Sequence, residues 1–111
     1  MPAVPELTPT EFCERWPDPA RSSQVTLLDV REHDELELAA IDGALHIPMR
    51  DVPARLAELD RDAPLVVMCH SGGRSRRVAE FLANNGFQQV FNLRGGIDAW
   101  STEIDPQVPR Y

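Results

Sequence analysis

Short runs of apolar residues alternate along this chain with segments whose apolar residues recur at helical spacing. The runs occupy residues 25–30, 45–47, 65–68 and 90–93. Each is rich in β-branched or other apolar side chains and is too short for a helix of ordinary length, so we predict buried strands there. Strands that alternate with helices are typical of an α/β domain with a mostly parallel sheet.

Helical spacing or helix-start signals occur at residues 8–16, 33–39, 52–59, 75–85 and 97–100. The first of these segments opens with a Thr-Pro-Thr-Glu capping box that has proline at the first helical position. The fourth is followed by a glycine that can act as its C-cap. We therefore predict a series of short helices that flank the sheet.

The length of 111 residues fits one domain with a core of its own. We expect residues 1–111 to form that single domain, with extended segments at 1–7 and 104–111. No apolar run approaches the length of a membrane span, and the N-terminus lacks the basic and apolar regions of a secretory signal. Two cysteines far apart in the sequence, Cys13 and Cys69, argue against a disulfide framework and suit a reducing cytoplasm.

The charge of the chain limits its partners. The formal net charge of -7 disfavours nucleic acid, because phosphate binding needs clustered positive charge. The basic residues Arg74, Arg76 and Arg77 nevertheless crowd near Cys69, whereas the acidic residues of segment 32–37 cluster elsewhere in the sequence. We therefore expect a local basic patch beside this cysteine, and no nucleic acid or membrane partner.

The stretch PLVVMCHSGGRSRR, residues 64–77, joins a predicted strand to a thiol, a glycine-containing loop and a helix start. Cys69 stands where the strand ends, and the helix begins at Arg74 or Ser75. A free thiol has a pKa of about 8.5 and reacts as the thiolate. The positive end of a helix, inward-facing loop amides and the Arg74 charge would all stabilise a thiolate. The candidate site residues are Cys69, His70, Ser71, Gly72, Gly73, Arg74 and Ser75.

Each feature also has a simpler structural interpretation. A cysteine that ends a strand is more often inert than catalytic, and only its combination with glycines, arginines and a helix start favours function. His70 could act as a general base, but most loop histidines face solvent or the rim of a site, so we expect a minor role. Asp29 and Arg31 lie at the edge where parallel sheets form ligand crevices, or they form an exposed loop pair. Cys13 is expected to be a packed thiol.

No grouping of cysteine and histidine has the spacing of metal ligands, and no glycine fingerprint for dinucleotides occurs. We therefore expect neither a metal nor a cofactor.

Four segments together resemble the single-domain rhodaneses, or thiosulfate sulfurtransferases, and the resemblance covers nearly the whole chain. They are LLDVRE at 27–32, IDGALHIP at 41–48, VVMCHSGGRS at 66–75 and LRGGIDAW at 93–100. Four such motifs in the family's order are far more specific than any one of them. The resemblance implies a three-layer α/β domain with a mostly parallel sheet of about five strands and short flanking helices.

The resemblance also implies a persulfide cycle. Cys69 would take sulfur from a small sulfur-containing anion such as thiosulfate and pass it to cyanide or a thiol. The loop amides of residues 70–75 would cradle the outer sulfur, and Arg74 would contact the donor anion. Asp29 and Arg31 fall on the family's Asp-any-Arg motif and are expected to support the loop rather than take part in chemistry.

Two alternatives remain. Phosphatases and arsenate reductases of the same fold have five residues between cysteine and arginine, whereas here four separate Cys69 from Arg74. The shorter loop suits a sulfur atom better than a phosphate group. The second alternative is a non-catalytic binding module. Such a module would need no nucleophile, so the presence of Cys69 argues against it. Arg76 and Arg77 could dock an acidic acceptor protein and so make the chain a carrier in a sulfur relay.

Overall fold

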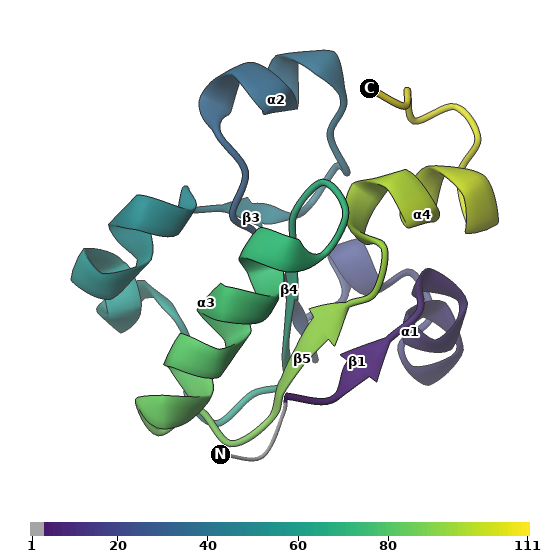
Figure 1. Cartoon of the computed structure of the whole chain (residues 1–111). Coiled ribbons are helices and arrows are strands. Elements are labelled where there is room, and N and C mark those ends of the chain that lie inside the picture. The colour runs from purple at the N-terminus through teal and green to yellow at the C-terminus, as the bar shows by residue number, and fades with distance from the viewer. Residues whose placement is uncertain (1–3) are drawn as a thin grey trace.

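The computed structural model describes residues 4–111 and shows a five-stranded sheet in the order β1-β5-β4-β2-β3 (Figure 1). Its strands are β1 (Glu6–Leu7), β2 (Thr26–Asp29), β3 (Leu45–His46), β4 (Leu65–Met68) and β5 (Val90–Leu93). Every pairing in this sheet is parallel. The prediction of an α/β fold with a mostly parallel sheet is confirmed, and so are the four predicted strands.

Helices cover both faces of the sheet. The α-helices are α1 (Pro9–Arg15), α2 (His33–Leu38), α3 (Gly73–Asn84) and α4 (Gly96–Glu103), and the 3₁₀ helices are η1 (Pro19–Arg21) and η2 (Met49–Glu58). One apolar core joins α3 and η2 to one face, with Val67 and Leu82 among its members. A second core joins α1 and α4 to the other face, with Phe12, Val66 and Trp100 among its members.

Neighbouring residues of a strand point to opposite faces, so Val66 and Val67 of β4 enter different cores. This explains why β4 is buried along its whole length and reads as a continuous apolar run. The three-layer arrangement follows directly from that pattern.

Several helix boundaries differ from those expected. The helix expected at 52–59 is a 3₁₀ helix, η2, that starts at Met49 and contains Pro53. Proline lacks the N–H that an α-helical hydrogen bond requires, and the backbone also departs from helical geometry at Arg55. The helix after the cysteine loop starts at Gly73, before the predicted Arg74 or Ser75, so more of the loop lies in the first helical turn.

The extended lead-in at 1–7 includes the edge strand β1, which pairs with β5. The amide of Asn92 donates to the Pro5 carbonyl at 3.0 Å, and the amide of Arg94 donates to the Leu7 carbonyl at 2.8 Å. Two strand residues give too short a pattern to be recognised in sequence. Residues 1–3 of the lead-in lie outside the described residues.

The segment 104–111 does not run extended along the surface as expected. The amide of Val108 donates to the Asp105 carbonyl at 3.0 Å in a turn, and the buried Ser101 hydroxyl donates to the Val108 carbonyl at 2.6 Å. The segment then returns toward α2, so that its end lies near the carboxyl edge of the sheet (Figure 1). Across residues 4–111 no helix has the length and apolar character needed to cross a membrane.

Candidate active site

The loop between β4 and α3 lies at the carboxyl edge of the sheet, where open parallel sheets form ligand crevices. The first turn of α4 holds this loop from the side. The amide of Ile97 donates to the Cys69 carbonyl at 2.9 Å, and the amide of Asp98 donates to the His70 carbonyl at 3.1 Å. The first amides of α4 therefore hold two loop carbonyls outward, toward α4. With these carbonyls directed away from the site, the amides of the loop face inward.

The Cys69 thiol is buried inside this loop, with 1% of the residue exposed. The amide of Gly72 donates to Cys69 Sγ at 3.1 Å. Burial by itself raises the pKa of the Cys69 thiol, but hydrogen bonding to Ser75 and to the Gly72 and Ser71 amides outweighs it, so the pKa is lowered. The structure thus brings together the cysteine, the loop amides and Ser75, as the sequence predicts.

Asn92 is a functional candidate that sequence reasoning missed. The fully buried Ser75 hydroxyl donates to Asn92 Oδ1 at 2.5 Å. Asn92 Nδ2 in turn donates to the Gly72 carbonyl at 3.1 Å and to Glu6 Oε2 at 2.9 Å. This side chain ties Gly72 and Ser75 to β5 and, through Glu6, to β1. The sequence does contain a signal for Asn92, because it is a single amide side chain within the apolar run 90–93. A polar side chain in a buried strand needs hydrogen-bond partners, and here those partners belong to the loop.

Asp29 and Arg31 form a buried ion pair, so the alternative of an exposed loop pair is wrong. Asp29 is 2% exposed and Arg31 0%, and Arg31 Nη2 lies 2.7 Å from Asp29 Oδ2. Arg31 Nη1 also donates to the Glu35 carbonyl at 3.3 Å and to the Tyr111 hydroxyl at 2.9 Å. Within residues 4–111, the side-chain hydrogen bonds of this pair reach α2 and Tyr111 rather than the cysteine loop itself.

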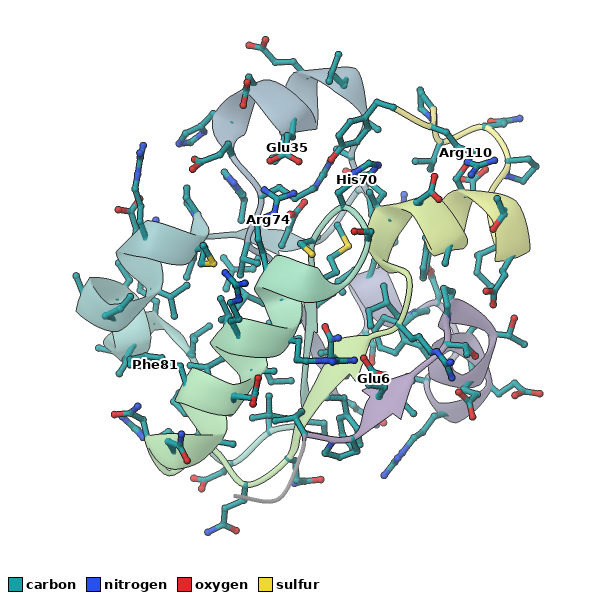
Figure 2. The ribbon with its side chains drawn as sticks, viewed as in Figure 1. Glu6, Glu35, His70, Arg74, Phe81 and Arg110 are labelled. Atoms are coloured by element: carbon teal, nitrogen blue, oxygen red, sulfur yellow. The ribbon has the colours of Figure 1, made fainter. Side chains whose placement is uncertain are left out.

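Arg74 is paired with a carboxylate, contrary to the expectation that the acidic cluster lies elsewhere. Figure 2 shows Glu35 pointing from α2 toward Arg74, and the two side chains form hydrogen bonds of 2.7 and 2.8 Å. The acidic segment reaches the site because α2 folds over the carboxyl edge of the sheet. Arg76 is likewise paired with Glu6, at 3.1 Å. The expected basic patch is therefore largely neutralised.

His70 lies at the rim of the site and is half-buried. Its ring stacks on that of Tyr111 with the centroids 4.2 Å apart and the planes at 15°. His70 Nε2 is buried without a hydrogen-bond partner among the described residues. The minor role expected for His70 stays a prediction, and Tyr111 is a second rim residue that sequence reasoning missed.

The close contact between α4 and the loop requires glycine at position 96. Gly96 has a φ of +58°, and a Cβ there would lie 2.3 Å from the Cys69 carbonyl oxygen and 2.5 Å from that of His70. We expect Gly96→Ala to lower the free energy of unfolding by about 2–4 kcal/mol, from backbone strain plus overpacking, as measured by chemical denaturation.

The matched control is Gly73→Ala in the same loop region. A Cβ on Gly73 would meet no atom of the described residues within 4 Å, and its φ is not in the left-handed region. We expect this variant to be unchanged or more stable by up to about 1 kcal/mol, because alanine favours a helix. Equal stability losses in both variants would contradict the assigned contact.

The described part of the chain, residues 4–111, contains no group of three or more His, Cys, Asp or Glu side chains placed to hold a metal ion.

Comparisons with known proteins agree with this geometry. A family model described as a rhodanese-like domain matches residues 16–103. A sulfurtransferase of Allochromatium vinosum is 39% identical over 105 residues, which cover 95% of each chain. The Rhodanese-like/PpiC domain-containing protein 12, chloroplastic, of Arabidopsis thaliana is 35% identical over 97% of this chain, which spans only 38% of that protein.

A crystal structure of a rhodanese-related protein from Thermoplasma volcanium matches with a TM-score of 0.80 and 29% identity, covering 97% of this chain and 100% of that one. Sequence and fold therefore point to the same group of proteins that the four motifs resemble. The chain belongs to the rhodanese-like domain family.

Proposed function

We propose that this chain is a sulfurtransferase that carries sulfane sulfur as a persulfide on Cys69. The observation that carries this proposal is the buried Cys69 Sγ, which accepts a hydrogen bond from the Gly72 amide at 3.1 Å and has a lowered pKa. A sulfur atom that is negatively charged before and after reaction suits a ring of backbone donors. The sulfurtransferase name of a relative with 39% identity over nearly its whole length supports the same class of reaction.

The proposed cycle has two displacement steps. The Cys69 thiolate attacks the outer sulfur of a donor such as thiosulfate, and the bond between that sulfur and the sulfonate group breaks. Sulfite leaves with the bonding electrons, and Cys69 holds the outer sulfur as a persulfide. A thiol or cyanide then attacks this sulfur, and the Cys69 thiolate is regenerated. The two steps need no oxidant and no cofactor.

The proposed roles of the other loop residues follow from their positions. The amides of residues 70–75 receive the outer sulfur, and Ser75 and Asn92 keep the loop in shape. Only four residues separate Cys69 from Arg74. A loop this short supports a single sulfur atom, rather than a phosphate group, as its occupant. A reducing compartment such as the cytoplasm, proposed from the two separate cysteines, would keep Cys69 available for reaction.

The test is to incubate the protein with thiosulfate and measure its intact mass. We expect a gain of one sulfur atom, located on Cys69 by peptide mapping and removed by cyanide with release of thiocyanate. A protein that gains no sulfur under these conditions, while folded, would instead be a binding module.

The lowered pKa of Cys69 predicts how this reaction depends on pH. Only the thiolate attacks, so the initial rate follows the ionised fraction of Cys69. Because hydrogen bonds hold the pKa below the usual thiol value, the rate should fall on acidification only at a lower pH than for an ordinary thiol. Stopped-flow measurement of adduct formation from alkaline to acidic pH checks this, and a decline centred at or above the ordinary thiol value would contradict it.

A further inference from the structure

The carboxylate of Glu35 is held at the mouth of the candidate site by four donors. Its Oε2 accepts from Arg74 Nη1 at 2.7 Å and from the Glu32 amide at 3.0 Å. Its Oε1 accepts from Arg74 Nη2 at 2.8 Å and from the Tyr111 hydroxyl at 2.9 Å. Both oxygens are therefore fully engaged, and the bidentate pair with arginine fixes the orientation of the carboxylate.

This carboxylate is linked to the cysteine loop by two separate connections. Arg74 belongs to the first turn of α3, and its hydrogen bonds to Glu35, followed by the charges of Glu35 and Cys69, raise the pKa of its guanidinium. Tyr111, which donates to Glu35, stacks on His70, the residue next to Cys69 in the chain. Figure 2 shows Glu35, Arg74 and His70 grouped between α2 and the loop.

Glu35 cancels the positive charge that an anionic donor would otherwise meet at Arg74. The hydrogen bond from Arg74 lowers the pKa of Glu35 to about 2, so the carboxylate is ionised at every pH near neutrality. A donor with two negative charges therefore approaches an arginine that already holds a carboxylate, on a chain with a net charge of -7. Each additional charge on the donor adds repulsion from Glu35.

We propose that Glu35 is a specificity-determining residue that occupies Arg74 and so favours sulfur donors with fewer negative charges over the thiosulfate dianion. The proposal rests on the proposed sulfurtransferase function and names the class of donor for the same site. The preferred donor would carry at most one negative charge.

Two donors of nearly the same shape separate charge from size. Methanethiosulfonate replaces one sulfonate oxygen of thiosulfate with a methyl group, and thus carries one negative charge in place of two. In both reactions the Cys69 thiolate attacks the outer sulfur and the bond from that sulfur to the oxidised sulfur breaks. Methanesulfinate or sulfite leaves with the bonding electrons, and Cys69 holds the transferred sulfur.

The experiment measures kcat/KM for both donors, with cyanide as acceptor, in the unaltered protein and in Glu35→Gln. Glutamine can still accept hydrogen bonds from Arg74 and Tyr111, and thermal unfolding checks that the variant is folded. We expect the ratio of kcat/KM for thiosulfate to that for methanethiosulfonate to rise roughly three- to tenfold, the effect of one unit charge near a protein surface.

The matched control is Glu37→Gln on the same helix, which removes the same charge from an exposed side chain. We expect that control to change the ratio by less than about twofold.

A second variant tests the same idea without removing the charge. Tyr111→Phe keeps the ring on His70 but deletes one donor to Glu35, so the carboxylate is held less firmly over Arg74. We expect the ratio to rise by about twofold, less than in Glu35→Gln, because the carboxylate keeps its charge and three of its four donors.

The outcomes distinguish this inference from the function on which it rests. The specificity role is wrong if the ratio of kcat/KM for thiosulfate to that for methanethiosulfonate in Glu35→Gln equals the ratio in Glu37→Gln, or lies below that of the unaltered protein. Sulfur transfer would still stand in that case. If neither donor adds sulfur to Cys69 in the unaltered protein, both the proposed function and the specificity role are wrong.

Discussion

Cys69→Ser is expected to reduce sulfur transfer from thiosulfate to cyanide by more than about a thousandfold, the loss typical when a covalent nucleophile is removed. Serine fits the same loop and can still accept the Gly72 hydrogen bond. Its hydroxyl stays protonated at neutral pH, however, and cannot hold a transferable sulfur. Thiocyanate formation, measured against time at several protein concentrations, checks the prediction.

Cys13→Ser is the matched control for this loss. Cys13 lies on α1, among the residues that pack against the core on the α1 and α4 face, and burial raises the pKa of its thiol. We expect this variant to keep most of the activity and to gain one sulfur from thiosulfate as the unaltered protein does. Equal activity losses in both folded serine variants would contradict the assignment of Cys69 as the sulfur carrier.

Arg31→Met is expected to have the largest effect on stability, a loss of about 3–5 kcal/mol in the free energy of unfolding. The substitution leaves Asp29 as a buried carboxylate without its cation, 2.7 Å from where the guanidinium was. It also removes the donors to the Glu35 carbonyl and the Tyr111 hydroxyl, so α2 and the end of the chain lose a shared anchor. Guanidinium denaturation followed by circular dichroism measures the loss.

Two further variants test the physical reason for this loss. Adding Asp29→Asn to Arg31→Met removes the unpaired charge but keeps an oxygen that can accept from the backbone amide of residue 31, so we expect part of the stability to return. Arg21→Met breaks a pair with Asp42 whose side chains are 67% and 91% exposed, and we expect a change of less than about 1 kcal/mol. A similar loss for Arg21→Met and Arg31→Met would show that burial is not the cause.

The strands at 65–68 and 90–93 could be predicted to the residue, because each is a short apolar run bounded by polar or turn residues. The capping box of α1 was equally clear, and Thr8 and Glu11 exchange the expected hydrogen bonds of 3.1 and 2.8 Å. In contrast, the apolar spacing of residues 52–59 predicts a helix but does not distinguish an α-helix from the 3₁₀ helix η2 that forms there. Only the backbone shows how Pro53 changes its hydrogen bonding.

The sequence by itself determined the strand, the cysteine loop and the helix start, and with them the lowered pKa of Cys69. Those features are local in sequence: the amide and side-chain groups around the sulfur come from one short stretch of the chain, although Asn92 and the first turn of α4 hold that stretch in place. The four motifs added the family and the expected chemistry.

Only the tertiary structure decided what surrounds that loop. Glu35 meets Arg74 across 39 positions of sequence, and Tyr111 meets Glu35 across 76. Such contacts depend on how α2 and the end of the chain pack over the carboxyl edge of the sheet, which no local pattern of residues encodes. The physical reason is that hydrophobic spacing determines which faces are buried, whereas the pairing of distant charges follows from the three-dimensional arrangement of those faces.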